Sequence, residues 1–249
     1  MKRNLLTITI LALSMTLFTN CEKEKPCENC PDTLAQLTDP NNPMNPFDKI
    51  GADHNVGLAF IRKNFQSQID AIDAASPLEA EHYVFAKSSE FGGNDAKLHL
   101  LLRDRLKLKD NELLRDVDFS DFDKVLGYFR LDDDTRQALS QSIRIIMRME
   151  PGSIEGTNAI INAIMEQERI IMANSRLENR DFALALLAVW RHSNYFWAET
   201  GNGPEPLKKK WWQITLADAI CGGVGFLLGG PAGGVGLGVG ASTLVAEKG

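Results

Sequence analysis

The stretch that decides the fold is Trp211–Ala246, which reads WWQITLADAICGGVGFLLGGPAGGVGLGVGASTLVA. It holds half of the chain's 20 glycines, and no charged side chain occurs from Ala219 to Ala246. An uncharged apolar run of this length is typical of a membrane span, and the alternative is a hairpin buried in the core of a helical domain. Either setting must offset the cost of glycine in a helix, about 1 kcal/mol each relative to alanine.

Small residues recur in this stretch every four positions, which places them on one face of a helix. The first series is Ala217, Cys221, Gly225, Gly229 and Gly233, and the second is Gly230, Gly234 and Gly238. Such faces let two helix backbones approach closely. The pattern resembles the glycine-zipper segments of bacterial envelope proteins and of some small pore-forming bacteriocins, and it predicts helix packing along these residues.

The motif Gly229-Gly230-Pro231 interrupts the run, since proline starts helices and disfavours helix in the residue before it. One helix over Ala219–Ala246 would be about 42 Å long, more than a bilayer core of about 30 Å needs. We therefore expect two antiparallel helices, about Trp211–Leu228 and Ala232–Ala246. They should meet along Ala217, Cys221, Gly225 and one glycine face of the second helix. The sequence leaves open whether this hairpin enters lipid or packs on the rest of the chain.

The N-terminus has the order of a secretory signal. Lys2 and Arg3 precede the apolar segment Asn4–Phe18, which is too short for an ordinary membrane helix, and Cys21 follows. This order resembles a bacterial lipoprotein signal, which implies removal of residues 1–20 and lipidation of Cys21. The alternative is an ordinary secreted protein. The resemblance predicts an anchor in the envelope of a Gram-negative bacterium, at the periplasmic or the surface face of the outer membrane.

Residues 21–46 are polar and rich in proline and asparagine, so we expect a flexible tether. The tether contains Cys27-x-x-Cys30 without the second pair of ligands that a zinc site requires. In an oxidising envelope compartment these cysteines would form a local disulfide or stay as free thiols. No metal site is predicted there.

From about residue 47 the chain shows successive apolar stripes with the 3.6-residue period of helices. One stripe is formed by Leu58, Ile61, Phe65, Ile69 and Ile72. The segment Phe182–Trp190 is apolar nearly all round, which predicts a central buried helix. We therefore expect an all-α fold, with a helical bundle domain over residues 47–207 and the glycine-rich hairpin over residues 208–249.

A short polar motif lies near the start of this domain. Gly51–Leu58 resembles an HN-x-GL segment in a group of exported Bacteroidota lipoproteins, some with a tryptophan-rich, glycine-zipper tail, and the resemblance implies no activity. Asp53 is expected to cap the helix that contains Leu58. If a polar site exists, His54 and Asn55 are its first candidates.

Three other groups of polar residues fit common structural roles better than catalytic or metal-binding roles. Glu168 lies inside an apolar stripe, where an arginine partner is a more common role than a catalytic acid. Glu79-x-x-His82 has the spacing of di-iron bundles, which need two such motifs and two further glutamates. Asp116-Val-Asp118-Phe-Ser120 begins like a calcium loop but lacks its glycine and glutamate. No metal and no cofactor is predicted.

The formal net charge is −6 and the sequence pI about 5.3, which argues against nucleic-acid binding. We expect an envelope lipoprotein with a structural or interaction-mediating, non-enzymatic role. Its partner is the membrane, through the lipid and the tail, with a protein partner or self-association as a further option. One alternative is a membrane-active or oligomerising protein that acts through its tail. Another is an enzyme with a site near His54.

Overall fold

The structure is a computed structural model that describes residues 36–95, 97–200 and 208–247. Its helices are α2 (Asp48–Ala75), α3 (Pro77–Gly92), α4 (Leu98–Arg105), η1 (Leu114–Asp116), α5 (Phe122–Leu126), α6 (Asp133–Ile146), α7 (Ile154–Ala173), α8 (Arg180–Glu199) and α9 (Lys208–Glu247). These ranges contain no strand, and the predicted all-α class is confirmed. The expected signal peptide, the lipidated Cys21 and the Cys27-x-x-Cys30 motif lie outside the described residues.

Several helix ends follow from local sequence. Ser76 accepts a hydrogen bond from the backbone N–H of Glu79 at 3.4 Å, and Pro77 opens α3. The helix stops at Gly93, whose φ of 67° is the left-handed conformation typical of a helix C-terminus. Asp132 caps α6 by accepting from the N–H of Thr135 at 2.8 Å.

The element α9 consists of two helices that meet at a sharp turn. Gly229 has φ −144° and ψ 17°, which are not helical. Gly230 has φ 63° and ψ −158°, a combination that almost only glycine adopts. Pro231 follows at the start of the next helix, where its missing N–H costs nothing. We term residues 208–228 the first arm and residues 231–247 the second arm.

The two arms touch backbone to backbone. A methyl group on Gly225 would lie 2.1 Å from the carbonyl oxygen of Gly233, and one on Gly233 would lie 2.3 Å from that of Gly225. Further along, a Cβ on Gly234 would lie 3.1 Å from the oxygen of Gly222, and one on Gly238 would lie 3.4 Å from the Cα of Gly222. No residue larger than glycine fits at Gly225 or Gly233 without separating the arms.

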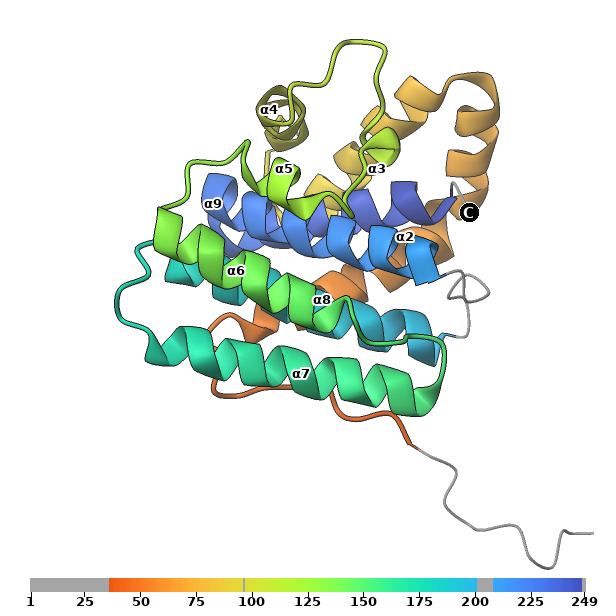
Figure 1. Cartoon of the computed structure of the whole chain (residues 1–249). Coiled ribbons are helices and arrows are strands. Elements are labelled where there is room, and N and C mark those ends of the chain that lie inside the picture. The colour runs from red at the N-terminus through yellow and green to blue at the C-terminus, as the bar shows by residue number, and fades with distance from the viewer. Residues whose placement is uncertain (1–35, 96, 201–207, 248–249) are drawn as a thin grey trace, which may run out of the picture. The chain divides into compact units, whose positions relative to one another are not determined.

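The hairpin runs through the middle of the helices. It packs against α2, α3, α4, α8 and η1, and α8 in turn packs against α7 on its other side (Figure 1). We term α2, α3, α4 and α8 the shell. Residues 182–194 of α8 are all buried, so the segment predicted as the central helix lies between α7 and the hairpin.

The predicted boundary at residues 207 and 208 is not a domain boundary, because Ala35–Gly249 form one compact unit. The hairpin is buried in the core of this unit, and Leu216, Ala219 and Leu237 are each 0% exposed. Glycine makes this possible by leaving room for shell side chains. A Cβ on Gly240 would lie 2.4 Å from the ring of Phe85 on α3.

The contact between the arms also differs in part from the predicted faces. Gly229 and Gly230 form the turn and do not pack as helical residues. On the first arm, the atoms nearest to the glycines of the second arm include those of Asp218, Gly222 and Gly225. These three residues are separated by steps of four and three, which stay on one face of a 3.6-residue helix.

The predicted tether is also too long at its C-terminal end. The backbone N–H of Thr38 donates to Oδ1 of Asn158 at 2.6 Å, and Nδ2 of Asn158 donates to the carbonyl of Gln36 at 2.9 Å. Proline and asparagine made residues 36–46 look unstructured, but their polar groups bond to α7 and α8. This segment is therefore part of the folded unit.

Replacement of Gly225 or Gly233 by alanine should destabilise the protein, because the added methyl group meets a backbone that cannot rotate away. Overpacking of this kind costs about 1–3 kcal/mol. Thermal denaturation followed by circular dichroism measures the loss. Gly127→Ala is the matched control, since Gly127 is exposed, has φ −63°, and its nearest atom lies 3.2 Å away in its own turn. Equal effects of all three substitutions would contradict the backbone contact.

Candidate functional site: a buried polar network around α8

Four consecutive polar residues lie inside the otherwise apolar helix α8. Arg191, His192, Ser193 and Asn194 are 0%, 2%, 0% and 0% exposed. Successive residues of a helix point about 100° apart, so each of the four reaches a different neighbour. Buried polar groups need partners, and the partners of these four residues define the network.

Arg191 joins three parts of the chain. Its Nη2 donates to Oε1 of Glu168 on α7 at 3.0 Å and to Oδ1 of Asp48 at the start of α2 at 2.6 Å. Glu168, which is 0% exposed, also accepts from Nδ2 of Asn42 at 2.6 Å and of Asn45 at 2.8 Å. The candidate acid Glu168 is therefore the partner of an arginine, and it also fixes the segment before α2.

His192 contacts the same carboxylate. Its Nε2 lies 2.9 Å from Oδ1 of Asp48. Burial raises the pKa of Asp48, but the hydrogen bonds from His192 and Arg191 and their charges outweigh it and hold the pKa below its ordinary value. Asp48 therefore stays ionised and compensates part of the positive charge of Arg191.

His54 and Asn55 lie where α2 crosses α8 and the second arm. Nδ2 of Asn55 donates to the carbonyl of His192 at 2.7 Å, which leaves its Oδ1 as an acceptor 3.1 Å from Nδ1 of His54. The His54 ring packs on Gly238, where a Cβ would lie 2.9 Å from it. Burial lowers the pKa of His54 to about 4, against the hydrogen bond with Asn55, so the ring is neutral near pH 7.

The same contacts explain the rest of the Gly51–Leu58 motif. A Cβ on Gly51 would lie 2.5 Å from the carbonyl oxygen of Ala188, and one on Gly57 would lie 2.7 Å from the ring of Phe91. Asp53, expected to cap a helix, instead lies within α2, because this helix already begins at Asp48. It pairs with Lys49 one turn earlier at 2.6 Å, on the exposed side.

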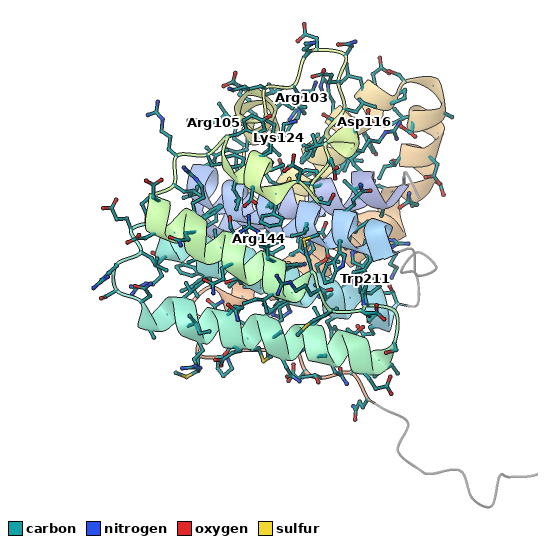
Figure 2. The ribbon with its side chains drawn as sticks, in the orientation of Figure 1. Arg103, Arg105, Asp116, Lys124, Arg144 and Trp211 are labelled. Atoms are coloured by element: carbon teal, nitrogen blue, oxygen red, sulfur yellow. The ribbon has the colours of Figure 1, made fainter. Side chains whose placement is uncertain are left out.

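Ser193 and Asn194 hold the first arm of the hairpin. Ser193 donates to Oδ2 of Asp218, which also accepts from Ser242 of the second arm at 2.9 Å and from Nε1 of Trp197 at 3.4 Å. Nε1 of Trp211, labelled in Figure 2, donates to Oδ1 of Asn194 at 2.8 Å. Burial raises the pKa of Asp218 to about 7, and the three hydrogen bonds lower it only in part.

A second buried ion pair lies apart from this network. Arg103 of α4, labelled in Figure 2, pairs with Glu81 of α3 and donates to the carbonyls of Lys109 at 2.9 Å and Glu112 at 2.8 Å. Glu81 also accepts from the backbone N–H of Leu114 at 2.7 Å. These bonds hold the loop that follows α4 against α3.

The network links the sequence candidates without bringing them to one accessible point. In the described residues, hydrogen bonds connect Glu168 to His54 through Arg191, Asp48, His192 and Asn55. The described residues hold no group of three or more His, Cys, Asp and Glu side chains that could bind a metal. Arg191, Asp48 and Asn55 each bond to a neighbouring helix, so the arrangement can orient helices. Among the described residues, Nη1 of Arg191 and Nε2 of His54 are buried without a hydrogen-bond partner.

Sequence reasoning missed Asp48 and the run Arg191–Asn194. A signal for the run was present, because four adjacent polar residues interrupt an apolar helix with large aromatic side chains on both sides. Comparison of the chain with protein-family models, with curated proteins and with solved structures found no match.

Glu168→Gln should lower the free energy of unfolding by about 3–5 kcal/mol, because it removes a charge that compensates the buried Arg191. Urea denaturation measures the change. Glu166→Gln on the same helix is the matched control: its pair with Arg169 has side chains 50% and 66% exposed, and such pairs contribute at most about 1 kcal/mol. Losses of equal size would contradict a structural role of the buried pair.

The stability of the protein relative to Asp218→Asn should fall as the pH rises. Because the pKa of Asp218 is about 7 in the folded protein and 3.8 ordinarily, its stabilising contribution is complete below about pH 4 and is lost as the pH rises through 7. The difference should change by on the order of 4 kcal/mol between pH 4 and pH 8. Urea denaturation of both proteins at several pH values measures it.

The comparison isolates Asp218, because His54 titrates in both proteins. His54 acts in the opposite direction, since its pKa of about 4 lies below the ordinary 6.5 and its contribution is lost as the pH falls from 6.5 towards 4. A stability difference that stays constant over this range would show that Asp218 does not titrate with a raised pKa.

Proposed function

We propose that this chain is a lipid-anchored protein of the bacterial cell envelope that acts through structure or association and does not catalyse a reaction. The observation that carries the proposal is the use of the polar residues. Of the groups that a catalytic site would need, Glu168 and Asn55 bond to the neighbouring helix α8 inside the fold. His54 bonds to Asn55 and packs on Gly238.

The burial of these groups supports the proposal. A general acid or base must reach the proton that it transfers, directly or through one water molecule. Glu168 and His54 are both 0% exposed, and both oxygens of Glu168 already accept hydrogen bonds. Catalysis by either side chain would require the core to open so that a substrate could reach it.

The anchor is supported by the sequence before the folded unit. Lys2, Arg3, the apolar segment Asn4–Phe18 and Cys21 have the order of a lipoprotein signal. The resemblance of Gly51–Leu58 to exported Bacteroidota lipoproteins agrees with it. Residues 36–46 pack against α7 and α8, so the tether that we propose between lipid and domain ends before residue 36.

Complementation of a host strain that lacks the gene tests the proposal. Wild-type protein from membranes should have an intact mass that begins at Cys21 and includes acyl chains. Cys21→Ala should lose both membrane association and complementation, with the melting temperature of the domain unchanged. Variants of His54 and Glu168 should lose complementation only to the extent that they lower the melting temperature.

Two results would contradict the proposal. A variant of His54 or Glu168 that abolishes complementation at an unchanged melting temperature would favour an enzyme. A Cys21→Ala protein that stays with the membrane would remove the lipid anchor.

A further inference from the structure

The hydroxyl groups of the hairpin donate to partners within the hairpin itself. From Thr215 to Ala246 its hydroxyl and carboxyl groups belong to Thr215, Asp218, Ser242 and Thr243. Thr215 donates to the carbonyl of Trp211 at 3.1 Å, and Thr243 to that of Val239 at 2.9 Å. Ser242 donates to Asp218 across the two arms at 2.9 Å. The three hydroxyl groups thus donate within the hairpin, as polar groups in hydrocarbon must. Asp218 accepts from Ser242 through Oδ2, and its Oδ1 is buried without a hydrogen-bond partner among the described residues.

The arms also contact each other directly, without shell residues between them at the glycines. The backbones touch at Gly225 and Gly233 and again where Gly234 approaches Gly222. Close backbone contact at small residues is how helices associate in lipid, where the hydrophobic effect does not drive them together. The hairpin therefore keeps its own interface in either environment.

The dimensions of the hairpin are close to those of a bilayer. Residues 211–228 make a helix of about 27 Å and residues 231–246 one of about 24 Å, beside a hydrocarbon core of about 30 Å. Trp211–Ala246 is the one stretch of the described chain that is long and apolar enough to cross a membrane, and 61% of its most apolar window is buried in the fold. The turn end is partly outside, with Leu227 43% exposed and Pro231 exposed.

Few polar bonds tie the hairpin to the shell. Ser193 and Trp197 bond to Asp218, and Trp190 donates to Thr215 at 3.1 Å. Trp211 donates to Asn194 at 2.8 Å, and Asn94 donates to the carbonyl of Ala232 at 2.8 Å. Most other contacts are apolar, made by side chains such as Val189, Phe182 and Phe85. Lipid chains can replace the apolar contacts with the shell, whereas they cannot replace the backbone contact between the two arms.

We propose that the Trp211–Ala246 hairpin can leave the shell and insert into a lipid bilayer as a unit, with the turn at Gly229–Gly230 leading. This activity goes beyond the proposed anchored role and does not depend on it. In the inserted state the two arms keep their glycine contact, and Ser242 keeps its hydrogen bond to Asp218. Residues of α8 and α2 that faced the hairpin remain with the shell.

Two engineered disulfides separate the movement of the hairpin from its internal structure. Val189→Cys with Gly222→Cys would lock the hairpin to α8, since a Cβ at Gly222 lies 3.3 Å from the Cβ of Val189. Phe226→Cys with Gly234→Cys would lock the arms to each other across 3.6 Å. Disulfides span Cβ distances of about 3.5–4.5 Å, so both pairs are within reach after small shifts.

The experiment uses the full chain with Cys27, Cys30 and Cys221 replaced by alanine. The protein is mixed with vesicles of phosphatidylethanolamine and phosphatidylglycerol that contain a photoactivated carbene probe dissolved in the lipid phase. Mass spectrometry then locates the labelled peptides. Without engineered disulfides, labelling of residues 211–246 should exceed that of α7 at least fivefold.

The disulfides should act in opposite ways. The closed bond between positions 189 and 222 should reduce labelling of the hairpin to the level of α7, and a reducing agent should restore it. The closed bond between positions 226 and 234 should leave it unchanged. Leu186→Cys with Gly223→Cys, whose Cβ atoms lie 3.0 Å apart, is a second lock if the first does not close.

Three results would overturn the inference. The first is hairpin labelling no higher than that of α7 in the protein without engineered disulfides. The second is hairpin labelling that stays the same when the hairpin is locked to α8. The third is loss of hairpin labelling when the two arms are locked together. The last would show that the arms must separate and that the hairpin does not insert as a unit. The labelling experiment does not require the proposed lipid anchor, because the added vesicles supply the membrane.

Discussion

The structure depends on the contact between two glycine backbones, Gly225 and Gly233. A Cβ on either would lie within 2.3 Å of the carbonyl oxygen of the other, so the arms can approach this closely only without side chains. The resulting hairpin is thin enough to lie between α8 on one side and α3 on the other. Larger residues here would separate the arms, and the surrounding helices would have to move outward with them.

The second constraint is electrostatic and lies in α8. Arg191 and Glu168 are both 0% exposed, and Asp48 and Asp218 add two more carboxyl groups in or near the core. A buried charge without a partner costs several kcal/mol, so a shift of α2, α7 or the hairpin along α8 would be unfavourable. Apolar contacts alone tolerate such shifts far better. The run Arg191–Asn194 thus fixes where three neighbouring elements lie along one helix.

The lipid-like composition of the hairpin and its burial do not conflict. The same flat, uncharged faces that suit a bilayer also suit the apolar side chains of a helical shell, because both surroundings offer only dispersion contacts. In either setting Ser242 on the opposite arm can donate to Oδ2 of Asp218. The sequence therefore could not distinguish lipid from core, and the structure described here shows the core.

Local sequence alone determined the helical class, the break at Gly229-Gly230-Pro231 and caps such as Ser76 and Asp132, because these depend on backbone preferences and on periodicity within one segment. Tertiary structure decided which faces of the arms meet, that residues 36–46 belong to the fold, and that Asp53 lies within α2. It also decided the roles of Asn55 and Glu168, which have partners on α8, 137 positions away for Asn55 and His192. Spacing along a chain reports which residues share a face, but the partner of a buried polar group is set by which helices pack together.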